Sequence, residues 1–192
     1  MHAVVRPDAF DPPRERLVRF GALVPARVAR GEWWRVATAA LLHHDVAHLA
    51  GNAVGLLVLG AALASAASPA RFAIVAAGAG VGGNLAQFEF GPPAAVTIGA
   101  SGMVFGLLGA LIAWRAHEIR ADRRALRSRE YLRLFGFALL ALLGVGRPGH
   151  TAWLAHAGGF LAGVLLAPRP RVASLRMVAA AQDDDQDWRR WN

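Results

Sequence analysis

The sequence predicts an all-α polytopic membrane protein. Of its 192 residues, 55% are hydrophobic, which exceeds the roughly 45–50% that is typical of soluble domains. The charges are also grouped: no charged residue lies between Asp45 and Arg71, or between Arg147 and Arg169. Crossing a bilayer takes about 20 predominantly apolar residues, and these stretches are long enough. The composition excludes a disordered chain, and the lack of cysteine excludes a disulfide scaffold.

Five segments are expected to cross the membrane, with tilt and flanking residues adjusting their lengths. They are Val46–Ala66, Phe72–Phe88, Ala94–Trp114, Tyr131–Gly146 and Thr151–Ala167. Glycine pairs with small-xxx-small spacing predict close helix packing, and these pairs are Gly51/Gly55, Gly102/Gly106 and Gly159/Gly163. Ahead of the first span, Gly31–Leu42 is too short and too polar to cross. We expect it to form an interfacial helix anchored by Trp33 and Trp34.

The charge distribution predicts the orientation and the domain limits. The loop Arg115–Arg133 holds seven arginines against three acidic residues, so it is expected on the cytoplasmic side. We expect an extramembrane segment over residues 1–30, the membrane domain over 31–168, and a cytoplasmic tail without stable structure over 169–192. The net charge of +8 is concentrated between hydrophobic spans, which favours contact with membrane lipid over nucleic-acid binding.

Polar residues inside membrane spans are costly, so each one suggests a function. Ser101 in GASG lies about two turns into the third expected span, and His156 in AHAGG lies at a similar depth in the fifth. Both are therefore expected roughly 8–10 Å below the external surface. A serine beside a histidine is the minimum for an activated hydroxyl, because the imidazole can accept the proton during attack and return it to the leaving amine.

Other polar residues gather at the same end of the expected bundle. His48 and Asn52 are four residues apart, so they share one helix face, and both can donate hydrogen bonds to a developing oxyanion. Gly99 and Gly102 flank Ser101 without side chains, which leaves room for a substrate backbone. From these residues alone, hydrolysis, a polar-lined transporter and a structural scaffold all stay open.

The chain contains WWR(x)7HH(x)3HLxxN, GASGMVFGLLGA and HAGGFLAG in this order. These segments resemble the characteristic blocks of the rhomboid family of intramembrane serine proteases, and the resemblance extends from about residue 31 to residue 167. It implies Ser101 as nucleophile and His156 as general base, without a third carboxylate. It also implies an oxyanion site formed by His48, Asn52 and the backbone amide of Ser101. No cofactor is implied, and the expected partners are transmembrane protein substrates.

The resemblance assigns further positions structural roles. Trp34 and Arg35 match the WR pair of a loop that dips into the membrane, and His43 matches a structural loop histidine. Phe105 falls where the family places an aromatic residue, often Tyr, against the catalytic histidine. Phe can stack there but cannot donate a hydrogen bond. His44 has no assigned role.

Two alternatives concern function and metal binding. A proteolytically inactive rhomboid-like protein that binds transmembrane partners would fit the same fold. His44 and His48 have the i, i+4 spacing of a helical zinc pair, but Asp45 stands where the HExxH motif requires Glu, so no metal is expected. The family resemblance implies a multi-pass protein, which we expect in a bacterial inner membrane.

The resemblance also generates a prediction about the N-terminal region. The basic bacterial rhomboid core has six spans, the first of which precedes the WR loop, whereas five are expected here. The first 45 residues also carry seven arginines against five acidic residues, which disagrees with an external location. We expect the chain to be less stable, and less active, than a version with an added upstream helix. Equal unfolding temperatures and equal cleavage by the two versions would contradict this expectation.

Overall fold

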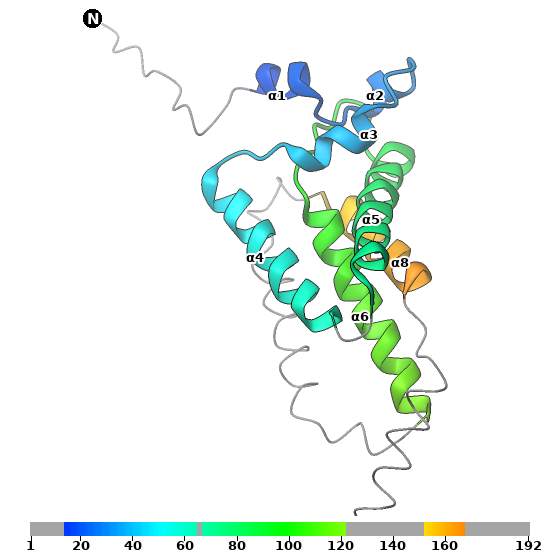
Figure 1. Cartoon of the computed structure of the whole chain (residues 1–192). Coiled ribbons are helices and arrows are strands. Elements are labelled where there is room, and N and C mark those ends of the chain that lie inside the picture. Colours follow the sequence, from blue (N-terminus) through cyan, green and yellow to red (C-terminus); the bar gives the residue numbers. More distant parts are fainter. Residues whose placement is uncertain (1–13, 65–66, 122–151, 168–192) are drawn as a thin grey trace, which may run out of the picture.

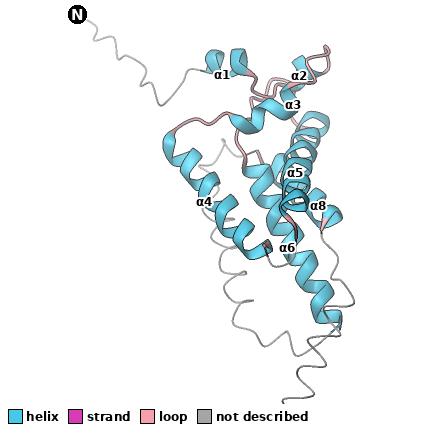
Figure 2. Cartoon of the chain, viewed as in Figure 1, coloured by secondary structure: helices cyan, strands magenta, loops and turns pink. Residues whose placement is uncertain are grey.

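The computed structural model describes residues 14–64, 67–121 and 152–167, and the regular elements within these ranges are helices (Figures 1 and 2). The short ones are α1 (Arg14–Phe20), α2 (Pro25–Val28), α3 (Arg35–Thr38) and the 3-10 turn η1 (Ala39–Leu41). The long ones are α4 (Val46–Leu63), α5 (Pro69–Phe90), α6 (Ser101–Ala121) and α8 (Trp153–Leu166). The long helices form a bundle, and the short elements α1, α2, α3 and η1 form a layer at one end of it, the N-terminal layer (Figure 1).

The closest packing in the bundle joins α8 to α6 through glycines. The α-carbon of Gly159 faces the carbonyl of Gly102, and that of Gly163 faces the carbonyl of Gly106; a β-carbon at either position would overlap these atoms. The two helices are therefore in direct backbone contact, as the small-residue spacing of both pairs predicts. The third predicted pair behaves differently, because Gly55 faces Val104 but Gly51 faces no neighbouring atom.

The hydrophobic core lies between α4, α5 and α6, farther from the N-terminal layer (Figure 1). Its fully buried members include Leu59, Leu63, Val75, Leu107 and Leu111. Apolar side chains are also exposed on every long helix, among them Leu57, Ile74, Ile112 and Leu165. A helix that is apolar on its outer face as well as its inner face suits a lipid environment.

The five expected spans are only partly represented. Among the described helices, α4 is long and apolar enough to cross a membrane, and α8 is apolar but has 14 residues. The predicted segment Tyr131–Gly146 lies outside the described residues, as do the tail from residue 169 and most of the arginine-rich loop. The number of spans therefore stays a prediction.

The prediction that the third span begins at Ala94 is wrong. Residues 91–100 form an irregular loop, and α6 begins at Ser101. In this loop Thr97 forms an isolated antiparallel bridge with Leu23, and Gly99 has a φ of 106°. A positive φ interrupts a helix and suits glycine. The backbone groups of Thr97 and Gly99 therefore form hydrogen bonds with Leu23 and Ala39 of the N-terminal layer instead of bonds within a helix.

The prediction of one continuous interfacial helix over Gly31–Leu42 is also wrong. The segment contains α3 and η1, which together cover residues 35–41. The Ala39 carbonyl, which would accept a bond from residue 43 in an α-helix, accepts bonds from the backbone N–H groups of Leu42 (3.3 Å) and Gly99 (2.9 Å). The contact with the loop before α6 thus ends the helix early.

Arg35 holds the N-terminal layer together. Its side chain is 2% exposed, and one guanidinium nitrogen donates to the carbonyls of Val18 (2.6 Å) and Ala22 (3.0 Å), while Nε donates to Glu32 (2.7 Å). This charge-assisted bond lowers the pKa of Glu32 below its usual range. A buried guanidinium requires such partners, so Arg35 fixes α1 and the turn after it against α3.

The glycine contacts predict how α6 and α8 respond to a larger side chain. In Gly159→Ala the new methyl group must push the helices apart, and we expect a loss of about 1–3 kcal/mol of unfolding free energy, as for other overpacked sites. Gly51→Ala is the matched control: its methyl group meets no neighbour, and alanine favours a helix by up to about 1 kcal/mol. Thermal unfolding in detergent measures both. A Gly159→Ala variant as stable as the control would contradict this packing.

Candidate active site

Ser101 and His156 meet where α6 and α8 touch. Ser101 Oγ lies 2.8 Å from His156 Nε2, although 55 residues separate the two in sequence. Ser101 is half-buried, and His156 is 5% exposed. The expectation that Ser101 lies two turns into its span is wrong, because it is the first residue of α6. The contact is possible because the adjacent Gly102–Gly159 approach brings the two helix backbones together.

Aromatic rings hold the His156 imidazole. Phe105 stacks on it with ring centroids 4.4 Å apart and planes inclined by 12°, and Trp153 presents its edge at 6.1 Å. The second ring nitrogen, Nδ1, is buried and has no hydrogen-bond partner among the described residues. In this part of the chain the orientation of His156 therefore depends on stacking instead of on a carboxylate.

His48 and Asn52 lie beside the backbone at Gly99. A β-carbon added at Gly99 would stand 2.8 Å from His48 Nε2 and 3.4 Å from Asn52 Nδ2. The amide nitrogen of Asn52 is buried without a hydrogen-bond partner in the described structure, which is unusual because buried donors are normally satisfied. The structure thus brings two side-chain donors of α4 to the loop that leads into Ser101.

The two glycines beside Ser101 differ in their surroundings. Gly99 has a positive φ, which would be strained in a residue with a side chain, and its α-carbon faces the side-chain nitrogens of His48 and Asn52. Gly102 is buried, and its α-carbon faces the backbone of Ala155 and Ala79. Gly102 therefore lies in the helix interface, whereas the space beside Gly99 adjoins the polar groups.

The remaining predicted residues support the site from the N-terminal layer. The Trp34 ring lies 4.5 Å from the Arg35 guanidinium. The His43 ring meets the His48 ring edge to face, with centroids 5.0 Å apart. Both contacts are packing contacts, and the second one orients the imidazole of His48.

Two neighbours of His48 have structural roles that the sequence analysis did not assign to them. His44 stacks on it with ring centroids 6.2 Å apart. Asp45 caps α4 by accepting a 2.7 Å bond from the His48 backbone N–H, which lowers the pKa of the Asp45 carboxyl. An aspartate directly before an apolar helix is a recognised start signal, so this cap could have been found. Within the described ranges, no three His, Asp or Glu side chains come together as metal ligands would.

These observations describe a helical membrane protein with a serine–histidine site at the ends of its helices. The Rhomboid domain model matches residues 30–169, and the chain belongs to the rhomboid family. The rhomboid protease GluP of Bacillus subtilis is 35% identical over 173 residues, which cover 86% of this chain and 32% of GluP. YdcA of the same bacterium is 34% identical over 72% of this chain and 68% of its own length. RHOMBOID-like protein 1 of Arabidopsis thaliana is 32% identical over 82% of this chain and 42% of its own length.

The half-buried position of His43 predicts a pH dependence of stability. Burial lowers the pKa of His43 from the usual 6.5, so the unfolded chain binds a proton before the folded one does as the pH falls. Stability is therefore lost as the pH drops through about 6.5. We expect the unfolding temperature to fall less between pH 8 and pH 5 in His43→Gln than in the unsubstituted protein. The same fall in both would show that His43 does not contribute.

Proposed function

We propose that this protein is an intramembrane serine protease that hydrolyses peptide bonds in transmembrane substrates. Ser101 is the nucleophile, and His156 is the general base. The observation that carries the proposal is the 2.8 Å contact between Ser101 Oγ and His156 Nε2, which lies within the distance needed for direct proton transfer. Membership of the rhomboid family and the similarity to GluP support it.

In this mechanism Ser101 Oγ attacks the carbonyl carbon of the scissile bond while His156 Nε2 takes the hydroxyl proton. The tetrahedral intermediate collapses as His156 returns that proton to the departing amine nitrogen, which leaves an acyl group on Ser101. A water molecule then attacks the acyl carbon, giving its proton to His156. The ester bond breaks, the proton passes to Ser101, and the carboxylic acid product is released.

The carbonyl oxygen becomes negative in each tetrahedral intermediate, and it requires hydrogen-bond donors. His48 Nε2 and Asn52 Nδ2, which adjoin Gly99, are suitable donors. The Asn52 amide has no hydrogen-bond partner among the described residues, which supports this role, because a preorganised donor without a ground-state partner stabilises charge as soon as it forms. The backbone N–H of Ser101 is a third candidate, since the first N–H groups of a helix have no acceptor within it.

Other residues of the site act through these groups. Phe105 and Trp153 keep the His156 imidazole in place, and His43 does the same for His48. Gly99 lets the loop before Ser101 pass close to the donors of α4. No cofactor or metal takes part in this chemistry. The proposal assigns the protein to a bacterial inner membrane as a multi-pass protein, with membrane-spanning helices as its substrates, and the family match and the two bacterial relatives support it.

The proposal predicts that both members of the dyad are essential. Ser101→Ala and His156→Ala should each lower the cleavage rate of a fluorescently labelled single-span reporter in liposomes by roughly 10³-fold or more, because the two groups act as a unit. His117→Ala, at an exposed position of α6, is the control and should cleave normally. Both dyad variants should keep the unfolding temperature of the unsubstituted protein within a few degrees.

Cleavage by either dyad variant within a few-fold of the unsubstituted rate would exclude the dyad. Cleavage by neither the unsubstituted protein nor the variants, with tight binding of the reporter by all of them, would support the inactive rhomboid-like alternative instead.

A further inference from the structure

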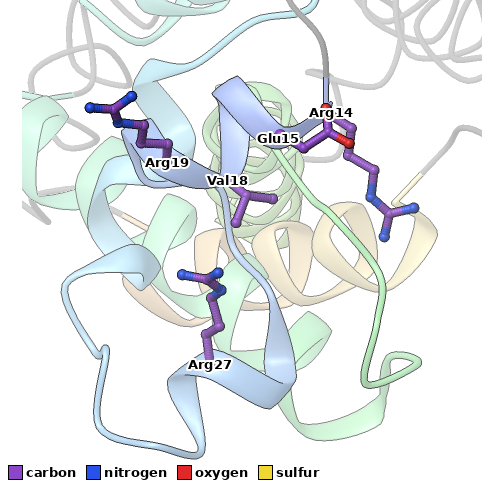
Figure 3. A pocket seen from close by; sticks show the side chains of 5 residues that line it. All are labelled: Arg14, Glu15, Val18, Arg19 and Arg27. Atoms are coloured by element: carbon purple, nitrogen blue, oxygen red, sulfur yellow. The ribbon is translucent and has the colours of Figure 1, made fainter.

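A second concave site lies in the N-terminal layer, and none of the proposed catalytic or oxyanion residues lines it. The cavity is about 330 Å³ and lies between α1 and α2 (Figure 3). Its lining residues are Arg14, Glu15, Val18, Arg19 and Arg27. In Figure 3, Arg14 and Arg19 stand on opposite sides of Val18, and the Arg27 side chain extends toward Val18 from the other helix. Three arginine side chains and one carboxylate-bearing side chain thus line the cavity, with the guanidinium groups of Arg14 and Arg19 on its opposite sides (Figure 3).

The positive charge of this arginine pocket is poorly neutralised. Arg27 Nη1 lies 3.7 Å from Glu32 Oε1, but Glu32 Oε2 is bound more closely by Arg35, at 2.5 Å. Arg14 donates one bond to the carbonyl of Ala94. In the part of the chain that the structure describes, neither Arg14 nor Arg19 forms an ion pair with Glu15. Guanidinium groups prefer planar two-point contacts with carboxylate or phosphate oxygens, so the pocket suits an anion.

The surroundings of the pocket indicate where that anion comes from. In the same N-terminal layer, Phe20, Trp33 and Trp34 are 64%, 54% and 48% exposed. Exposed Trp side chains are typical of the membrane interface, where their rings lie at headgroup level, and apolar residues beside arginines are typical of segments that lie in the interface plane. An arginine pocket within such a layer would lie at the depth of the lipid phosphates.

We propose that the arginine pocket binds the phosphate group of an anionic phospholipid headgroup. Soluble phosphate offers the same chemistry, but the exposed aromatic side chains of the same layer favour the lipid. Binding here would tie α1 and α2 to the headgroup layer. Because Arg14 bonds to the loop that leads into Ser101, the lipid would also stabilise the position of that loop.

The test uses the full chain purified in an uncharged detergent. Binding of phosphatidylglycerol is measured by native mass spectrometry and by the shift in unfolding temperature, with phosphatidylcholine and inorganic phosphate as parallel probes. The pocket variant is R14Q/R19Q. The matched control is R16Q/R30Q, which removes the same charge from exposed arginines that do not line the pocket. Each double variant also loses one side chain-to-backbone hydrogen bond, from Arg14 or from Arg30.

We expect the pocket variant to bind phosphatidylglycerol about tenfold more weakly than the unsubstituted protein, and the control to stay within about twofold. If R14Q/R19Q fails to fold, Arg19→Gln alone serves, and it should weaken binding about threefold.

Three results would overturn the proposal. Equal weakening in the two double variants would mean that only overall charge matters. Equal binding of phosphatidylcholine would exclude recognition of an anionic headgroup. Arginine-dependent binding of inorganic phosphate without any binding of phosphatidylglycerol would assign the pocket to a soluble anion.

Discussion

The backbone contact between α6 and α8 is the constraint on which the site depends. Serine and histidine have short side chains, so a hydrogen bond between them across two helices requires the helix axes to approach more closely than ordinary side chains allow. Glycines at 102, 106, 159 and 163 provide that approach. The Ser101–His156 contact is one turn or less from the nearest of these glycines, so the packing that stabilises the bundle also sets the geometry of the pair. A substitution in the interface between α6 and α8 is therefore expected to affect both the stability of the bundle and the Ser101–His156 contact.

The N-terminal layer provides the other half of the site. Arg35 joins α1 to α3, and the backbone bond from Gly99 to Ala39 holds the loop before α6 against η1. Asn84 of α5 donates to the Val36 carbonyl and ties the layer to the bundle. Through these contacts the loop passes beside the side chains of His48 and Asn52. The proposed lipid pocket lies in this same layer, and its Arg14 donates to the carbonyl of Ala94 in the loop before Ser101.

Much of this arrangement could be read from the sequence. The charge-free runs located the long helices, and the small-residue spacing identified the two glycine pairs that join α6 to α8. Reading Ala94–Trp114 as one apolar span failed, because hydropathy does not register the positive φ of Gly99 or the bridge between Thr97 and Leu23. The prediction of one helix over residues 31–42 failed for a related reason. The Ala39 carbonyl, where the helix would continue, accepts a bond from the backbone N–H of Gly99, which lies some 60 positions away in the sequence. Local patterns predict elements, whereas long-range backbone bonds decide where they stop.

The central claim is that helix packing produces a serine activated by His156. Reaction with a serine-directed fluorophosphonate probe in liposomes, with the adduct located by peptide mass spectrometry, tests it most directly, because the probe requires an activated serine but no knowledge of the substrate. The account predicts a single adduct on Ser101 that is lost when His156 is replaced by Ala, in a protein that still unfolds at its normal temperature. An adduct on another serine, or labelling of Ser101 at an unchanged rate without His156, would contradict it.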